Sequence, residues 1–379
     1  MLVTADAPAI DEDLDHLIPP GYKPEEAADE KGLWMEFEEM ELSLNKSALL
    51  IRDPELVNYV NGIVCKVAGD YCNDFRVYLV RNSGFNASMT ATGMMQVWTG
   101  LIVRVTSTDE IAAVVGHEIA HYTRLHSLQR FRDLKSKLAT ASFFDLGFAV
   151  LTGISAPVGQ AAAILSILSF SRSQETEADI LGTRLLAEAG YDPHAAYDIW
   201  YELLAEEEAA AVKREQPGMF SQTHPNSAER AEYLKQFVYD RYGPRYATGT
   251  ADPELLRILN NHYTLLMGDQ IDTNRFGRTE EILRRHEKIG VDPGILYFFR
   301  GEMYRQRGEP GDLELAMAAY RKSIEQENVP AAAYKNLGYL YLKTKDLTSA
   351  QENFRKYLDA DPEASDRAMI EFYLEEESP

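Results

Sequence analysis

The chain has 379 residues, which is enough for two or three domains, and 45% of them are hydrophobic, as in globular proteins with well-formed cores. Its formal net charge of −22 argues against a nucleic-acid partner, because the phosphates would be repelled. We therefore expect a folded, acidic protein that does not bind nucleic acid.

The first 33 residues are acidic, contain several prolines and show no sustained periodicity, so we expect an irregular leader. The first residues, MLVTADAPAIDEDLDHL, contain neither the basic nor the apolar stretch of a signal peptide. Either the protein is cytoplasmic, or this sequence is the mature form of an exported protein.

Apolar residues recur at helical spacing from Leu33 to about Tyr71, which predicts two helices, and Asp53-Pro54 is a good start for the second. The chain has two cysteines, Cys65 and Cys72, close together in sequence. They form either a disulfide at a helix end or two reduced, partly buried thiols.

Three short strands are predicted next, at 75–80, 86–89 and 96–100, with a turn at Asn82-Ser83-Gly84 after the first. A small sheet just before the following helix has a functional use. Its exposed edge strand can pair with an extended peptide.

The stretch from Glu110 to His126 contains the pattern H-E-x-x-H, formed by His117, Glu118 and His121. Residues four apart share one face of a helix, so the two imidazoles converge, and Glu118 can reach the same point. Two imidazole nitrogens and a carboxylate base are what a hydrolytic zinc site needs. The alternative is two exposed histidines beside a glutamate, but the apolar flanks favour the zinc site because burial of these groups is costly without a metal.

This helix is predicted to start at a cap among residues 107–109 and to continue through Leu128 and Phe131. The strongly apolar stretch 143–170 follows, interrupted by Asp145 and Pro157 among others. It is long enough for a membrane span. Two helices packed on the site, or one lying on a membrane surface, fit the interruptions better.

Glu175 and Asp179 are four residues apart on the next predicted helix, 171–190. One of these carboxylates can supply a third zinc ligand. The charged cluster is otherwise a solvated helix face, but its place at the end of a long apolar segment favours the ligand.

After a helix at 195–213, a His-Pro turn at His224 precedes another helix that carries Arg230. Such a turn either aims both groups at one cleft or merely caps the helix and leaves a surface arginine. The stretch 241–252, rich in Gly, Pro and Thr, is the expected domain boundary.

The last third of the chain contains tetratricopeptide (TPR) repeats. One copy lies between Ala331 and Ala364, an upstream copy contains Gly301 and Tyr320, and a degenerate copy is expected between residues 255 and 290. The clearest copy matches the repeat pattern at Tyr334, Leu337, Gly338, Tyr341, Ala350, Phe354, Tyr357 and Pro362. Stacked helical pairs of this kind form a peptide-sized groove.

With these pieces together, the chain resembles the HtpX and CAAX-prenyl-protease family of zinc endopeptidases, and most of all its BepA-like branch with C-terminal TPR repeats. The resemblance covers Trp34 to the C-terminus. It rests on Gly100-Leu101, the H-E-x-x-H at 117–121, the E-x-x-x-D at 175–179 and the H-P-x-x-x-x-R at 224–230.

The resemblance implies a role for each matching residue. His117, His121 and Glu175 would bind one zinc ion per chain, and Glu118 would be the general base. Asp179 would orient a ligand histidine, and Arg230 would lie near the developing oxyanion. His224 would be able to take the fourth zinc position and hold the enzyme closed. The chain departs from the family after Asn86-Ala87, where SMTATGMM replaces a Gly-rich, Pro-containing turn, at Arg300, where Leu is usual, and in showing no signal peptide.

We therefore predict an α+β, mostly α fold. An irregular leader at 1–33 precedes a gluzincin-like zinc metallopeptidase domain with a small sheet at 34–245, and an α-helical TPR solenoid follows at 253–379. The predicted function is hydrolysis of extended or misfolded polypeptide. By resemblance it belongs to envelope quality control in the periplasm, with outer-membrane assembly proteins as partners of the TPR domain and peripheral membrane contact through 143–170. The alternative is a TPR chaperone with a dormant protease half.

Overall fold

The computed structural model describes residues 17–24, 29–138, 170–213, 215, 227–245 and 252–375. They form two compact units. The first holds the described residues up to Glu207 together with 227–245, and the second begins with the last turn of one helix, from Glu208, and continues from 252 onward. The mostly α fold with one small sheet is as predicted from the sequence.

The sheet of the first unit has the order β1-β3-β2, from β1 (Arg76–Val80), β2 (Ala87–Met89) and β3 (Met94–Trp98). β1 runs parallel to β3, and β2 runs antiparallel to it. The prediction that the third strand reaches Gly100 was wrong, because α3 (Thr99–Ile102) begins there. The Gly100 N–H donates to Asn82 O at 2.8 Å, and this bond turns the chain out of the sheet.

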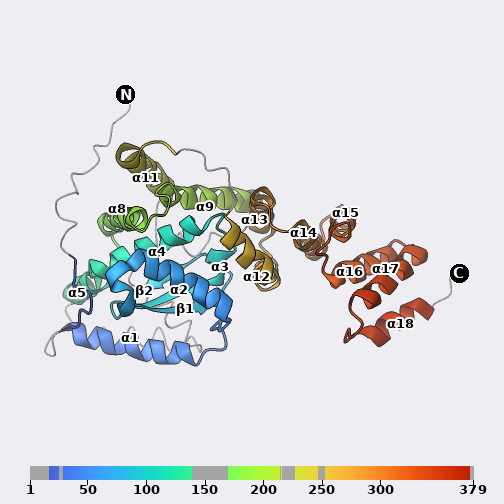
Figure 1. The fold of residues 1–379 in the computed structure, drawn as a ribbon, viewed down its shortest axis with the longest axis horizontal. Helices are drawn as coiled ribbons and strands as arrows, with labels where there is room; N and C mark the ends of the chain where they lie inside the picture. The colour runs from blue at the N-terminus through green and yellow to red at the C-terminus, as the bar shows by residue number, and fades with distance from the viewer. Residues whose placement is uncertain are drawn as a thin grey trace. The chain divides into compact units, whose positions relative to one another are not determined.

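Helices cover both faces of the sheet (Figure 1). α1 (Asp29–Asn45) packs Leu44 against Met94 and Trp98 on one face, and it begins before Leu33, where the irregular leader was expected to end. α2 (Pro54–Ala68) contacts β1 and α4 on the other side, and Asp53 caps it as predicted.

A disulfide joins Cys65 of α2 to Cys72 of the following 3-10 helix η1 (Gly69–Asp74). Of the two states that the sequence left open, the chain therefore adopts the bridged one. The bridge holds the end of α2 against the turn that leads into β1.

The long helix predicted to run through Phe131 is instead two helices, α4 (Thr108–Thr123) and α5 (His126–Leu138). Leu125 lies between them with φ of 54°, in the left-handed region. A helix cannot continue through that conformation, so the chain turns and the second helix starts in a new direction. The N-cap of α4 is Ser107, whose hydroxyl accepts from the Glu110 N–H.

Among the described residues, three further helices lie in the first unit: α8 (Arg172–Glu188), α9 (Ala195–Val212) as far as Glu207, and α11 (Ser227–Tyr242). α8 packs along α4 at a crossing of two glycines. A Cβ added to Gly116 would lie 2.8 Å from Gly182 O, and one added to Gly182 would lie 2.7 Å from the His117 nitrogen. The two backbones therefore approach as closely as they do because neither position carries a side chain.

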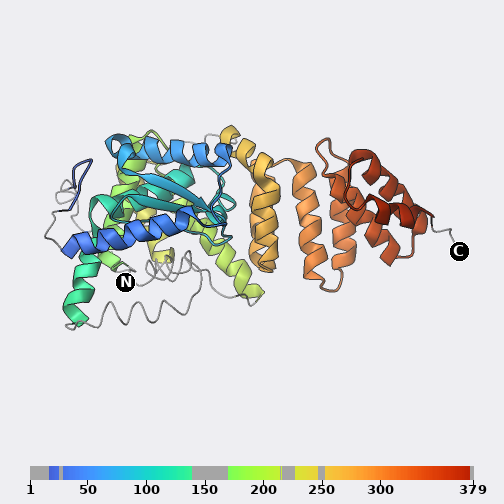
Figure 2. The same ribbon diagram turned by 90° about the horizontal axis from the view of Figure 1, so that it is seen from below.

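The second unit consists of helices that follow one another in chain order (Figures 1 and 2). They are α12 (Pro253–Asp272), α13 (Phe276–Ile289), α14 (Pro293–Arg307), α15 (Asp312–Ile324), α16 (Ala331–Lys343), α17 (Leu347–Ala360) and α18 (Arg367–Glu375). In successive pairs a glycine faces an aromatic ring: Gly301 faces Tyr320, and Gly338 faces Phe354. These contacts join the two helices of each predicted repeat.

No helix in the described parts of the chain is long and apolar enough to cross a membrane. Apart from Phe170, the stretch 143–170 lies outside the described residues, so none of its three predicted arrangements is tested.

Candidate metal centre

The H-E-x-x-H residues lie in the second half of α4, where the helix is buried. His117, Glu118 and His121 are 6%, 3% and 1% exposed, so the alternative of exposed histidines is excluded. The Nε2 atoms of the two histidines lie 3.0 Å apart. The helical spacing thus makes both rings point to one place, as the sequence predicted.

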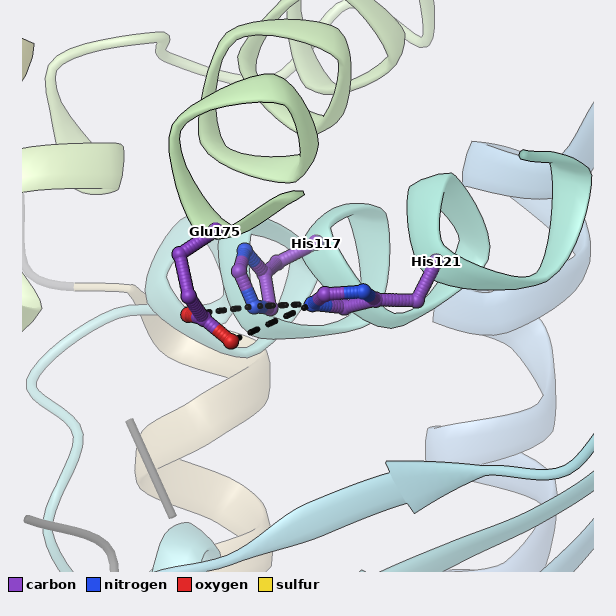
Figure 3. Close-up of side chains that lie close together, drawn as sticks. All are labelled: His117, His121 and Glu175. Atoms are coloured by element: carbon purple, nitrogen blue, oxygen red, sulfur yellow. Dashed lines mark hydrogen bonds and ion pairs between the residues drawn. The ribbon is translucent and has the colours of Figure 1, made fainter. Parts of the chain in front are cut away.

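Glu175 reaches the same place from the first turn of α8 (Figure 3). A capping box of Ser171 and Gln174 starts this helix, and the glycine crossing brings it against α4. The carboxylate oxygens of Glu175 lie 3.6 Å from His117 Nε2 and 3.7 Å from His121 Nε2. Glu175 is 3% exposed, which excludes a solvated helix face.

Asp179 lies one turn further along α8 and is 5% exposed. Its Oδ1 lies 2.9 Å from His117 Nδ1. A carboxylate accepts hydrogen bonds, so the proton of His117 sits on Nδ1, and the lone pair of Nε2 faces Glu175 and His121. Burial alone would raise the pKa of Asp179, but the charges of Arg230 and His117 hold it well below its usual range.

Arg230 of α11 is 3% exposed and ties the two carboxylates together. Its Nε donates to Asp179 Oδ2 at 2.8 Å, and its Nη1 lies 2.8 Å from a Glu175 oxygen. The guanidinium stacks on the Trp200 ring, 3.9 Å from its centre, and the Tyr233 hydroxyl also donates to Asp179. Arg230 is therefore not a surface arginine, whereas the turn at His224 lies outside the described residues.

Glu118 points between the helix and the sheet. The backbone N–H of Met89, in edge strand β2, hydrogen-bonds its carboxylate, while the buried Oε1 has no hydrogen-bond partner. Burial raises the pKa of Glu118 to about 7, with the charge of His117 opposing it. A carboxyl group with this pKa is suited to take and return a proton near neutral pH.

The side chains present fit a divalent metal. One ligand atom each from His117, His121 and Glu175 can be chosen so that all lie within 4.8 Å of one another. Two imidazole nitrogens and one carboxylate oxygen are a common donor set for catalytic zinc. The unpartnered Oε1 of Glu118 is a further sign of a polar group at this place, because buried polar atoms are rarely left unsatisfied.

His224 lies outside the described residues, so its predicted place at the metal is not tested. The sequence analysis missed several residues around the cluster, among them Met89, His126, Trp200 and Tyr233, and also Glu177, which contacts His126. Their contacts depend on the tertiary packing, which residue spacing alone does not give.

Comparison with known proteins gives a match to peptidase family M48 over residues 51–238 and to a tetratricopeptide repeat over 331–363. A putative beta-barrel assembly-enhancing protease of Vibrio cholerae is 30% identical over 198 residues, 49% of this chain and 40% of that protein. The beta-barrel assembly-enhancing protease of Escherichia coli K12 is 27% identical over 246 residues, 60% of this chain and 49% of that protein.

The mitochondrial metalloendopeptidase OMA1 of Schizosaccharomyces pombe is 29% identical over 173 residues, 43% of this chain and 47% of that protein. The aligned regions cover less than half the length of each of these three relatives. All of them are proteases by name, and the match to the peptidase family includes every described residue of the cluster.

Proposed function

We propose that this chain, which matches peptidase family M48 over residues 51–238 and a tetratricopeptide repeat over 331–363, is a zinc-dependent endopeptidase that hydrolyses extended or misfolded polypeptide. The observation that carries the proposal is the convergence of His117, His121 and Glu175, buried and within 4.8 Å of one another. The proposed peptidase domain spans 34–245, and the proposed repeat domain spans 253–379.

In the proposed mechanism those three residues hold the zinc ion. When bound, zinc supplies Lewis acidity toward water and toward the scissile carbonyl. Glu118 takes a proton from the attacking water and delivers it to the leaving amine. Its buried, otherwise unsatisfied Oε1 supports this role, because that atom is available to accept the proton.

Asp179 and Arg230 support the reacting groups. Asp179 keeps the His117 proton on Nδ1, so that Nε2 can bind a metal. Arg230 lies against both Glu175 and Asp179. We propose that its positive charge also stabilises the developing oxyanion, as the resemblance implied.

Edge strand β2 is the proposed binding site for the substrate backbone. Asn86 O accepts from the Trp98 N–H, and the Thr90 N–H donates to Met94 O. Backbone groups alternate in direction along a strand, so those of Ala87 and Met89 point away from β3. An extended peptide that paired with them would lie next to Glu118, to which the Met89 N–H already donates.

A cavity beside His117 supports recognition of an apolar side chain near the scissile bond. It lies between α4, α9 and α11. Its apolar lining consists of Phe85, Ala113, Val114, Ala196, Ile199, Trp200 and Leu234. We propose that it receives a substrate side chain.

Metal analysis tests the proposal directly. The purified chain is expected to hold about one zinc ion, to lose cleavage of unfolded casein when a chelator removes it, and to regain cleavage when zinc is restored. Glu175→Ala should lose the metal, whereas Glu188→Ala, on the same helix but away from the cluster, should keep it. A chain that carries no metal, or cleaves equally well without it, contradicts the proposal and favours a dormant protease half with a TPR scaffold.

We further propose that His224 is a displaceable fourth ligand that suppresses activity. Its position six residues before Arg230, whose side chain lies beside Glu175, supports this proposal. His224→Ala is then expected to raise the turnover of unfolded casein severalfold. Unchanged turnover, together with unchanged sensitivity to chelators, would leave His224 as a turn residue.

The proposed compartment is the bacterial periplasm. The disulfide between Cys65 and Cys72 supports an oxidising compartment and argues against the cytoplasm. Two of the relatives are named for enhancing beta-barrel assembly. We propose that this chain acts in envelope protein quality control and that its TPR unit binds outer-membrane assembly proteins.

A further inference from the structure

His126, the first residue of α5, returns to the metal cluster although its sequence position does not predict this. In one continuous helix a residue five positions after His121 would point about 140° away from it. The left-handed turn at Leu125 brings the ring back instead. His126 is fully buried, and its Nδ1 lies 2.9 Å from His121 Nδ1.

The hydrogen-bond partners of His126 determine where its proton lies. Its Nε2 lies 3.3 Å from a carboxylate oxygen of Glu177, which can only accept, so the proton sits on Nε2. The Nδ1 of a neutral His126 then offers a lone pair, and His121 Nδ1 must be the donor to it. This arrangement leaves the lone pair of His121 Nε2 facing His117 and Glu175, where the ligand atoms converge.

Two further contacts hold these groups in place. Arg124 forms an ion pair with Glu177, in addition to the contact that Glu177 makes with His126. Phe170 stacks on the His121 ring, with 3.8 Å between ring centres and 19° between planes. The plane of the His121 ring and its proton position are therefore both set by neighbours outside the cluster.

We propose that His126 and Glu177 are positioning residues that fix the tautomer and orientation of His121 for metal binding, as Asp179 does for His117. The inference rests on the proposed zinc site. His126 is not itself a further ligand, because it contacts His121 at Nδ1, across the ring from the converging Nε2 atom. The two proposed ligand histidines thus have different partners. His117 contacts the carboxylate of Asp179, whereas His121 contacts the neutral imidazole of His126, which in turn contacts the carboxylate of Glu177.

Two substitutions of His126 separate the roles of its nitrogens. His126→Asn keeps a hydrogen-bond acceptor, the amide oxygen, near the position of Nδ1, and it removes the N–H that contacts Glu177. His126→Gln keeps a donor near the place of Nε2 and removes the acceptor for His121. If positioning is the role, His126→Gln should weaken zinc binding by about 10–100-fold. His126→Asn should bind zinc within a few-fold of the unchanged chain.

Zinc affinity is measured by competition with a chromophoric chelator, and the coordination geometry by the visible spectrum of the cobalt(II)-loaded full chain. We expect His126→Gln to alter the cobalt spectrum and His126→Asn to preserve it. His194→Gln is the matched control. That histidine is also buried and paired with a carboxylate, Asp192, but lies away from the metal cluster. It should change thermal stability without changing zinc affinity.

The outcomes are distinguishable. If both His126 variants bind zinc as the unchanged chain does, or lose it equally, the positioning role is overturned while the zinc site stands. If the unchanged chain binds zinc with this dependence but cleaves nothing, the proposed protease function fails and the positioning role stands. If it binds no zinc, both fail. Should His126→Gln not fold, Glu177→Ala, at a partly exposed side chain, must weaken zinc binding severalfold without lowering the melting temperature of the metal-free chain.

Discussion

Glu118→Gln is expected to keep the metal and lose cleavage. The side chain lies beside the three proposed ligands but is not one of them, and an amide of the same shape can still accept the Met89 N–H. It cannot take up a proton, so hydrolysis of unfolded casein should fall by about 10²–10⁴-fold. Zinc content per chain should stay at the level of the unchanged protein.

The matched control for this experiment is Glu229→Gln, which removes the same charge from an exposed position on α11. It should cleave casein at the original rate. A Glu118→Gln protein that digests casein as fast as this control would show that Glu118 is not the base. Loss of zinc from Glu118→Gln would mean instead that Glu118 contributes to metal binding.

Gly182→Ala is expected to disrupt the proposed metal site without replacing any of its ligand side chains. The new Cβ would lie 2.7 Å from the His117 nitrogen and 2.8 Å from the Gly116 carbonyl carbon. These are backbone atoms, so α8 must move away from α4 and carry Glu175 with it. Overpacking of this kind costs about 1–3 kcal/mol of unfolding free energy. Zinc affinity and casein cleavage should both drop sharply.

Gly62→Ala is the control for Gly182→Ala. Gly62 lies in the middle of α2, and an added Cβ there would meet nothing within 4 Å. Replacing a helical glycine by alanine at such a site stabilises a protein by about 0.5–1 kcal/mol. A Gly182→Ala protein with unchanged zinc affinity and melting temperature would show that the close helix crossing does not hold Glu175 in place.

Much of this fold could be predicted from local patterns. Alternating residues marked the short strands, and the repeat spacing around Gly301 and Gly338 marked the helical pairs. The convergence of His117 and His121 followed from helical spacing alone. Glu175 required one further inference, that a carboxylate after an apolar segment turns inward, and its burial agrees with that inference.

The features that could not be predicted depend on single backbone conformations or on distant partners. Leucine rarely adopts a positive φ, so nothing in the sequence marks Leu125 as the end of α4. Thr99 and Gly100 read as strand residues, and only their hydrogen bonds to Asn82 turn them into a helix. The proton positions on His117 and His121 depend on Asp179 and His126, whose contacts the spacing alone does not give.

The contacts of Arg230 have a consequence for how the protein would acquire a metal ion. Arg230 of α11 forms ion pairs with Glu175 and Asp179 of α8, and Asp179 in turn contacts His117 of α4. The three proposed ligands are thus held by ion pairs and hydrogen bonds within the protein, unlike those of small zinc modules in which the ion drives the chain to fold. We therefore expect maturation in two separate stages, with folding first and metal capture afterwards.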